Sequence, residues 1–200
     1  MSEKLKGVKW SDSLISQIYS LQTLVSTPEL NDKIEEIVKM IGSVKGMIYF
    51  TGIGKNAHTA ARVSDTFQSL GIKSLYIDSV NSLHGGIGIF SSNDVLVAIS
   101  KSGETEELIK FLNALLNQNF RNIIAVTSNY NSSLAKIAKI SLMVPIKNEG
   151  DHLGLAPIAS TMVYGAILDS IAVEISSGRG YSKLDFVRNH PGGELGKTKV

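Results

Sequence analysis

The sequence of 200 residues contains no cysteine. Disulfides, thiolate metal sites and cysteine nucleophiles are therefore excluded together. The sequence also lacks an excess of charge of one sign, because 20 Lys and Arg residues and 18 Asp and Glu residues give a formal charge of +2. Its basic residues are scattered along the chain, which argues against nucleic acid or a membrane surface as a partner.

Long hydrophobic runs are missing as well. The longest apolar stretches, such as Val95–Ile99, are far too short to span a bilayer. The first nine residues, Met1–Lys9, are charged and do not have the pattern of a signal peptide. These absences predict a cytoplasmic protein. Hydrophobic residues make up 43% of the chain, which is sufficient to fill the core of one domain.

The first part of the chain has the spacing of two helices. Ser11 and Asp12 are candidate caps of the first helix, and Thr27 with Pro28 marks the start of the second, with proline at its first helical position. Each helix carries an apolar stripe at helical spacing: Leu14, Ile15 and Ile18 in the first, and Leu30, Ile34 and Ile37 in the second.

From residue 47 onward, short apolar runs rich in branched residues alternate with segments of helical pattern. This alternation predicts an α/β fold with a doubly wound, mostly parallel five-stranded sheet. The expected strands are 47–50, 74–77, 94–99, 122–126 and 140–144. The expected helices are 56–70, 105–116, 132–138 and 160–177, with a short helix before His190. The connection 79–93 is expected to be mostly loop, with room for a short helix at most. We expect one domain over 1–200, with N-terminal helices in 1–45 and the α/β core and C-terminal site segment in 46–200.

Ligands of such a sheet bind at the carboxyl ends of the strands, so the loops there carry the chemistry. The first unusual loop, Thr51–Ala57, has glycines that let the backbone approach an anion at the start of a helix. A phosphate-binding P-loop is excluded, because Tyr49 and Asn56 stand where it needs glycine and Ser or Thr. A plain tight turn, with Asn56 as N-cap and Lys55 in solvent, is one alternative.

The same loop also fits the spacing of a dinucleotide-binding turn. Gly52, Gly54 and Ala57 match that spacing, and Asp78 ends the next strand where a ribose-binding carboxylate is expected. This interpretation favours a dinucleotide-dependent oxidoreductase. It leaves the second unusual loop, described next, unexplained.

The second loop, Ser100–Thr105, follows an apolar strand and opens a helix. Its three hydroxyls around Gly103 form a concave set of hydrogen-bonding groups suited to a phosphate. In the alternative interpretation Ser102 only caps the helix by accepting from the N–H of Thr105. A serine-hydrolase elbow is excluded, because the residue two positions before Ser102 is Ser100 instead of glycine.

Two histidines lie in loops next to glycine or proline, where side chains are placed for access: His84 and His190. Glu149 lies in a further loop ahead of His152, which could be a surface residue. No pair of histidines has the spacing of metal ligands, so we expect no metal.

The stretch Ile99–Thr105 resembles the phosphate-binding signature of sugar isomerase (SIS) domains. Further stretches are similar to the arabinose-5-phosphate isomerases within that family: Gly52–Lys55, His84–Gly85, Leu153–Pro157 with Ser160 and Thr161, and His190–Gly196. The resemblance runs from about Ile48 to Gly196. Related phosphohexulose isomerases share the phosphate loop.

This resemblance implies a set of site residues. Ser100, Ser102 and Thr105 would hold the phosphate, and Lys55, His84, Glu107, Glu149 and His190 would surround the sugar, with His190 supplied by a neighbouring subunit. Gly52, Gly54, Asn56, Gly103 and Ser160 complete the expected substrate-binding set. The sequence departs from the family at Asn56, where serine is usual, and at Gly86, where an acidic residue is usual. Many members also carry a pair of cystathionine-β-synthase domains, and we expect this chain to lack that regulation.

An aldose–ketose isomerisation moves a proton between C1 and C2 and needs a base, an acid for the oxygen and a stabiliser for the enediolate, but no cofactor. We expect Glu149 to be the carbon base, with a pKa raised by partial shielding from water. His190 or His84 would transfer the oxygen proton, and Lys55 would stabilise the enediolate. Glu107 either orients Lys55 or only favours the helix start.

The resemblance therefore predicts an isomerase of D-ribulose 5-phosphate and D-arabinose 5-phosphate, which would supply the bacterial surface sugar 3-deoxy-D-manno-octulosonate. The alternatives are a non-catalytic sugar-phosphate-binding SIS regulator, an isomerase of another sugar phosphate such as a phosphohexulose, and the oxidoreductase. The apolar stripes of the first two helices exceed what a five-stranded core needs, so we expect a homo-oligomer, a tetramer, whose sites share His190.

Overall fold

The computed structural model describes residues 7–197, so residues 1–6 of the charged N-terminal stretch and residues 198–200 lie outside the described part. A parallel sheet forms its centre, with the strand order β2–β1–β3–β4–β5. Its strands are β1 (Ile48–Gly52), β2 (Ser74–Tyr76), β3 (Val95–Ile99), β4 (Ile123–Thr127) and β5 (Ile140–Met143). The predicted parallel sheet of five strands is confirmed.

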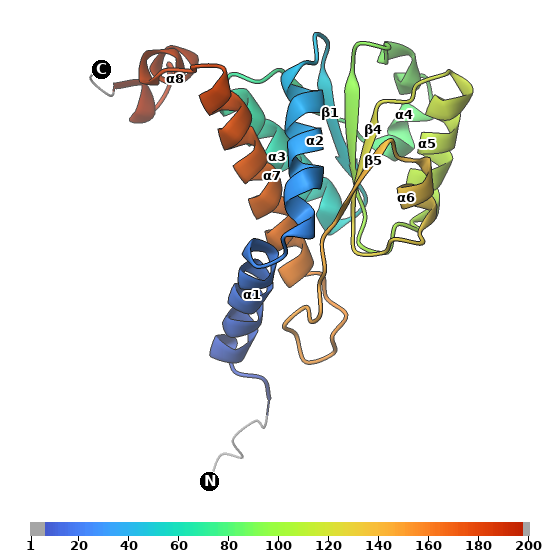
Figure 1. Cartoon of the computed structure of the whole chain (residues 1–200), viewed down its shortest axis with the longest axis vertical. Helices are drawn as coiled ribbons and strands as arrows, with labels where there is room; N and C mark the ends of the chain where they lie inside the picture. The colour runs from blue at the N-terminus through green and yellow to red at the C-terminus, as the bar shows by residue number, and fades with distance from the viewer. Residues whose placement is uncertain (1–6, 198–200) are drawn as a thin grey trace.

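Helices cover both faces of the sheet (Figure 1). One face carries α2 (Glu29–Gly42), α3 (Lys55–Ser69) and α7 (Ala159–Gly178), and the other carries α4 (Ser79–Ser82), the 3₁₀ turn η1 (Gly86–Ile89), α5 (Glu106–Asn117) and α6 (Ser133–Ile137). Side chains alternate between the two faces along each strand, so Phe50 enters one buried cluster and Tyr49 the other. Because both faces are covered, every residue of β1, β3 and β4 is buried.

Several helix starts differ from the sequence expectation. The helix α1 (Trp10–Val25) has Lys9 as its N-cap, so Ser11 and Asp12 lie in the first turn, where the Asp12 carboxylate accepts from the N–H of Lys9 at 3.2 Å. Pro28 is the N-cap of α2 and not its first helical residue. The connection 79–93 contains the short α4, for which the expectation left room, and in addition the 3₁₀ turn η1.

The two N-terminal helices use their apolar stripes differently. Helix α2 packs against α7 and β5, and its Leu30 and Ile37 are buried in the core there. On α1, which packs beside α7, Leu14, Ile15 and Ile18 are 46%, 61% and 46% exposed. The expected surplus of apolar surface is therefore found on α1, and the expectation was wrong for α2.

The strand order creates a switch point between β1 and β3. The chain passes from β1 outward to β2 and then returns across β1 to form β3 on its other side. Gly52 pairs in register with Ile99, so the loops that follow β1 and β3 leave the same edge of the sheet next to each other. In parallel sheets ligands bind in the crevice at such a point. At the far end of the chain, α8 (Lys183–Asn189) and the 3₁₀ turn η2 (Leu195–Lys197) follow α7. Within the described residues, no helix has both the length and the apolar character that crossing a membrane requires.

Candidate active site

The loop Ser100–Thr105 is held in shape by its own hydroxyls. The buried Ser100 Oγ accepts from the N–H of Gly103 at 3.1 Å and lies 3.0 Å from Thr105 Oγ1. The exposed Ser102 Oγ accepts from the N–H of Glu104 at 3.2 Å. These bonds fix the loop in advance, while the Ser102 hydroxyl remains open to solvent.

Gly103 is required at the bend of this loop. Its φ of +66° lies in the left-handed region that favours glycine, and a Cβ there would lie 2.2 Å from Ser132 Oγ. The carbonyl of Gly103 accepts from the N–H of Leu134 at 3.0 Å, and the carbonyl of Ser102 accepts from Asn129 Nδ2 at 3.1 Å. The segment after β4 thus supports the loop from behind.

The first turn of α5 opens onto these hydroxyls. Thr105 is the N-cap residue, and its side chain makes no capping hydrogen bond to α5 because it faces Ser100. The interpretation of Ser102 as a cap that accepts from the N–H of Thr105 is therefore wrong. A helix N-terminus without a side-chain cap, beside three hydroxyls, is a favourable place for a phosphate.

The neighbouring loop Gly52–Lys55 brings its glycines close to α3. A Cβ on Gly52 would lie 2.8 Å from the backbone carbonyl carbon of Asn56, and Gly54 has a φ of +59°. Gly54 is the N-cap of α3, so the expectation that Asn56 caps this helix was wrong. Asn56 lies in the first turn, and its Oδ1 is buried without a hydrogen-bond partner within the described residues. Lys55 begins the helix and is exposed at the switch point.

Glu149 lies in the loop between β5 and α7 and is only 1% exposed. Its Oε2 accepts from the N–H of Ile158 at 2.9 Å, from the N–H of Ser160 at 3.0 Å and from Ser160 Oγ at 3.1 Å. Its Oε1 accepts from Lys101 Nζ at 2.5 Å. The carboxylate therefore accepts hydrogen bonds from the start of α7 on one side and from the Lys101 ammonium on the other.

These contacts overturn the expected protonation of Glu149. Burial alone raises the pKa of its carboxyl, but hydrogen bonds from Lys101 and Ser160, together with the charge of Lys101, outweigh burial and lower the pKa below its ordinary value. The expectation of a raised pKa was wrong for this state of the site. Ser160 is fully buried and donates its hydroxyl to Glu149, so the structure gives it a partner other than a substrate.

His84 and Glu107 lie at the same edge of the sheet. The N–H of His84 donates to the carbonyl of Asn81 at 3.0 Å in the turn after α4, and α4 packs against α5, whose first turn contains Glu107. Both side chains are exposed. The described residues include no ion pair between Glu107 and Lys55, so the orienting role of Glu107 stays a prediction.

Helix α7 runs from this edge of the sheet to the opposite one. Near its end, Ser176 Oγ donates to the carbonyl of Leu70 at 2.9 Å, and Arg179 Nη2 donates to the carbonyl of Gly42 at 3.1 Å. Leu70 precedes β2 and Gly42 precedes β1, so these contacts mark the edge where the strands begin.

His190 follows α8 at that opposite edge. In Figure 1, the β5–α7 connection lies at one end of α7, and α8 lies beyond the other end. The His190 ring stacks on Phe186 with the ring centroids 3.9 Å apart, and its Nδ1 lies 2.7 Å from the Phe186 carbonyl oxygen. His190 therefore does not fold back to the site of its own chain.

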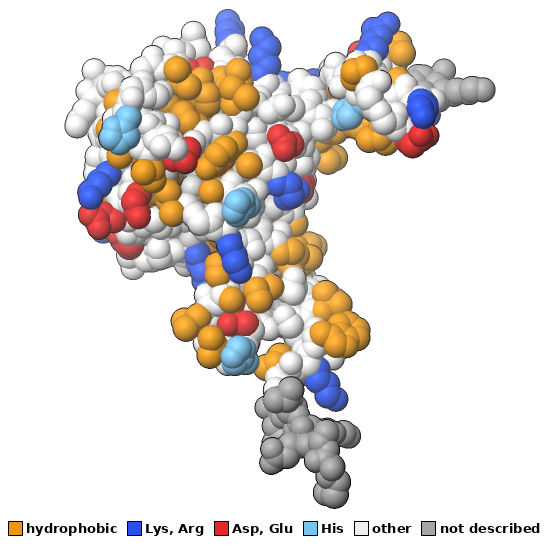
Figure 2. All heavy atoms as spheres, turned by 180° about the vertical axis from the view of Figure 1, so that it is seen from behind, with side chains coloured by type: hydrophobic (Ala, Val, Ile, Leu, Met, Phe, Trp, Pro, Cys, Tyr) orange, Lys and Arg blue, Asp and Glu red, His pale blue; other side chains and the backbone are white. Residues whose placement is uncertain are grey.

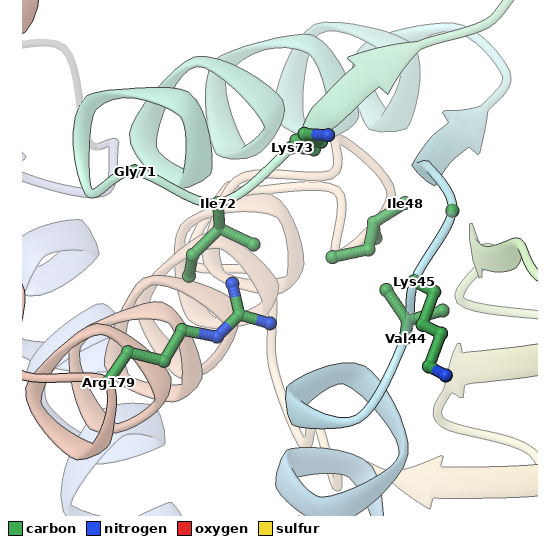
Figure 3. Close-up of a pocket in the computed structure, with 8 residues that line it drawn as sticks. Val44, Lys45, Ile48, Gly71, Ile72, Lys73 and Arg179 are labelled. Atoms are coloured by element: carbon green, nitrogen blue, oxygen red, sulfur yellow. The ribbon is translucent and has the colours of Figure 1, made fainter.

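Two hollows of the single chain lie at opposite edges of the sheet. A cavity of about 250 Å³ opens at the edge where the strands begin, lined in part by Lys45, Lys73 and Arg179 (Figure 3). The Arg179 guanidinium there already donates hydrogen bonds to the carbonyls at the end of α2. Lys55 and Ser102 line neither this cavity nor the groove of about 350 Å³ beside the start of α2.

Lys101 is a site residue that the sequence pattern does not reveal. In the sequence it stands between Ser100 and Ser102. The only feature that pointed to a role in the site was its positive charge inside a segment suited to phosphate. Its bond to Glu149 spans 48 positions of the chain and could not be read from spacing. The described residues contain no group of three or more His, Cys, Asp or Glu that could hold a metal ion.

Comparison with known proteins places this geometry in context. The SIS domain family matches residues 41–174. The arabinose 5-phosphate isomerase KpsF of Escherichia coli O6:H1 is 37% identical over 186 residues, which cover 92% of this chain and 56% of that protein. The arabinose 5-phosphate isomerase KdsD of Yersinia pestis is 32% identical over 168 residues, which cover 84% of this chain and 51% of that protein. This chain thus spans about half the length of these relatives.

Among solved structures, c3406 of Escherichia coli CFT073 in complex with arabinose 5-phosphate superposes with a TM-score of 0.86 at 29% identity. The match covers 90% of this chain and 95% of that one. The similarity therefore extends over nearly the whole of both chains.

Proposed function

The chain belongs to the SIS domain family, and from this we propose that it is an aldose–ketose isomerase that interconverts D-ribulose 5-phosphate and D-arabinose 5-phosphate. One observation carries the proposal: the hydroxyl-rich loop Ser100–Thr105 and the loop Gly52–Lys55 leave adjacent strands at the switch point. Two kinds of relatives support it. The curated ones are arabinose 5-phosphate isomerases, and the solved one is a complex with arabinose 5-phosphate.

The phosphate of the sugar binds at the start of α5 in this proposal. The hydroxyls of Ser100, Ser102 and Thr105 and the N–H groups of the first helical turn supply hydrogen bonds to it. The glycines Gly52 and Gly103 allow the backbone to approach the substrate closely. Phosphate binding is remote from the reacting carbons and positions them for reaction.

The carbons then lie among the charged groups of the neighbouring loops. Glu149 is ionised, as a base must be, and takes the proton from C2 of the aldose to give a cis-enediol before returning it to C1. The ammonium of Lys55 stabilises the enediolate oxygen. His84, or His190 of the partner subunit, moves the proton between the two oxygens.

We propose that the site is shared between copies of the chain in a homo-oligomer, a tetramer. His190 lies at the edge of the sheet opposite to Glu149, so one chain alone lacks that histidine at its site. A surface for a second copy is available on α1. Hydrophobic side chains gather there, above the grey N-terminus in Figure 2, and include Trp10 at 80% exposure and Ile15 at 61%.

Two further parts of the proposal follow from the chemistry of the substrate. Charged sugar phosphates do not cross membranes unaided, so the enzyme works in the cytoplasm where they are made. The arabinose 5-phosphate it forms would supply 3-deoxy-D-manno-octulosonate synthesis. The oxidoreductase alternative is disfavoured, because the Asp78 carboxylate caps α4 by accepting from the N–H groups of Val80 and Asn81 at 2.8 and 3.0 Å.

The test is incubation of the purified protein with D-arabinose 5-phosphate in heavy water, without added cofactor, followed by NMR. We expect D-ribulose 5-phosphate to form and deuterium to enter C2 of the remaining aldose. Binding of the sugar phosphate without turnover would favour a non-catalytic SIS regulator. Turnover of a hexulose phosphate in preference to the pentose would favour a phosphohexulose isomerase.

A further inference from the structure

The ion pair between Lys101 and Glu149 joins two loops of different character. Lys101 belongs to the loop proposed to bind phosphate, and its backbone is fixed because its carbonyl accepts from Thr127 Oγ1 at 3.1 Å and from the N–H of Ser128 at 3.0 Å. Only its side chain reaches across to Glu149, before α7. The pair therefore connects the phosphate loop with the proposed carbon base.

The two partners of this pair are held very differently. Glu149 is 1% exposed, and its other oxygen keeps three hydrogen bonds from Ile158 and Ser160 whether or not the ammonium is present. The Lys101 side chain is 39% exposed, and lysine is a flexible four-carbon stem that carries a point charge. If one partner moves, it is Lys101.

A phosphate in the loop would compete for this ammonium. Lys101 stands directly between Ser100 and Ser102, and a phosphate monoester carries about −1.5 to −2 charges against −1 for the carboxylate. Lysine binds phosphate readily as a point charge. Tyr164 on α7 is buried close enough to sense the charge of Glu149, and burial raises the pKa of its phenol, so it stays neutral. A phenol carries no positive charge in either protonation state, so Tyr164 cannot replace Lys101 beside Glu149.

We propose that Lys101 exchanges partners: it pairs with Glu149 when the site is empty and moves to the phosphate of the bound sugar phosphate. This rests on the proposed function, because it takes the Ser100–Thr105 loop as the phosphate site. After the exchange Glu149 keeps the donors of α7 but loses the adjacent positive charge, and it becomes a stronger base. Substrate binding would thereby prepare the base in the same step.

The experiment measures binding of inorganic phosphate by calorimetry to the wild type, Lys101→Met, Glu149→Gln and the double variant. We expect Lys101→Met to weaken binding by at least about tenfold, since it removes one charge-assisted bond. Glu149→Gln removes the competitor and should tighten binding by roughly two- to fivefold, as for a partly exposed ion pair. The double variant should bind like Lys101→Met within about twofold, because without Lys101 the competitor has no effect.

Two further variants serve as controls. Lys39→Met removes one positive charge from an exposed position of α2 and should leave phosphate binding unchanged. Lys101→Arg keeps the charge and should retain most of the affinity, even if Lys101→Met proves unstable. Weakened binding in Glu149→Gln, or an unchanged affinity in Lys101→Met, would overturn the exchange while leaving the isomerase proposal intact. A wild type that binds no phosphate would overturn both.

Discussion

The sharing of the site between subunits can be tested by combining two inactive variants, Lys55→Ala and His190→Ala. Ser160, which is bonded to Glu149, and Gly178, at the end of α7, are separated by 18 helical steps, which span about 27 Å at ~1.5 Å per residue. His190 follows a further helix beyond that end. No side chain reaches back over this distance, so a site that uses His190, as proposed, would take it from another copy.

The expected yield follows from counting. After dissociation and random reassembly of equal amounts, half of the chains carry an intact Lys55 and the other half an intact His190. About one quarter of the sites then combine both intact residues, so the mixture should regain about a quarter of wild-type activity from two inactive proteins. The assay is isomerisation of arabinose 5-phosphate, with subunit exchange confirmed by native mass spectrometry.

A matched control uses Lys55→Ala with Glu149→Gln. Both residues belong to the edge of the sheet at the ends of β1 and β5 of one chain, so every mixed site retains one defect and activity should stay low. The sharing argument fails if the first mixture remains inactive despite exchange. It fails equally if the control mixture recovers as much activity.

The remaining predictions concern single residues of the site. Ser102→Ala should raise KM about tenfold or more without lowering the melting temperature, because an exposed hydroxyl gives the phosphate a bond worth roughly 1.5–3 kcal/mol; an unchanged KM would remove Ser102 from the phosphate site. Glu149→Gln should lower kcat by about 10²–10⁴-fold, and a near-normal kcat would pass the base role to a histidine. Because the pKa of Glu149 is lowered, its ionised carboxylate stabilises the fold at pH values above 4.5, its ordinary pKa. This stability is lost as the pH falls through the lowered pKa. The gap in unfolding free energy between wild type and Glu149→Gln should therefore narrow below about pH 4.5 in urea titrations, and a widening gap would contradict the sign. Gly86→Asp would place a Cβ 3.0 Å from Ser82 Oγ and 3.1 Å from Ser82 Cβ, so its melting temperature should fall; an unchanged value would show that the contact relaxes freely.

The sheet could be predicted from the sequence because its central strands are buried on both faces. A strand such as Val95–Ile99, with all of its residues buried, must be apolar throughout, and that run is visible in the sequence. Helix starts were less predictable. The N-cap of α3 is Gly54 with a positive φ, and the polar Asn56 two residues later is the more usual capping type. The backbone conformation at the start of the helix, and not the capping preference of the side chain, therefore sets the N-cap.

The stripes on the first two helices show what tertiary packing adds. Leu30 and Ile37 on α2 recur at helical spacing, as Leu14 and Ile18 do on α1, but only those of α2 meet the sheet. Periodicity identifies an apolar face without indicating what covers it. The difference becomes visible only in the fold, where α2 lies beside α7 over the sheet and α1 lies beyond the sheet (Figure 1).

Glu149 illustrates the limit for the chemistry of the site. Its place in a loop at the end of β5 was evident, but the donors that lower its pKa come from Lys101, Ile158 and Ser160, which folding alone brings together. The start of α7 is buried, and its N–H groups must find an acceptor. The carboxylate that supplies this acceptor is also the proposed base, so stability and catalysis place demands on the same atoms. Truncation to alanine would leave those N–H groups unsatisfied and confound the two, at about 1–3 kcal/mol for each buried group. Glutamine keeps an acceptor oxygen for α7 and removes only the basic charge, and is therefore the substitution that separates the catalytic role from the structural one.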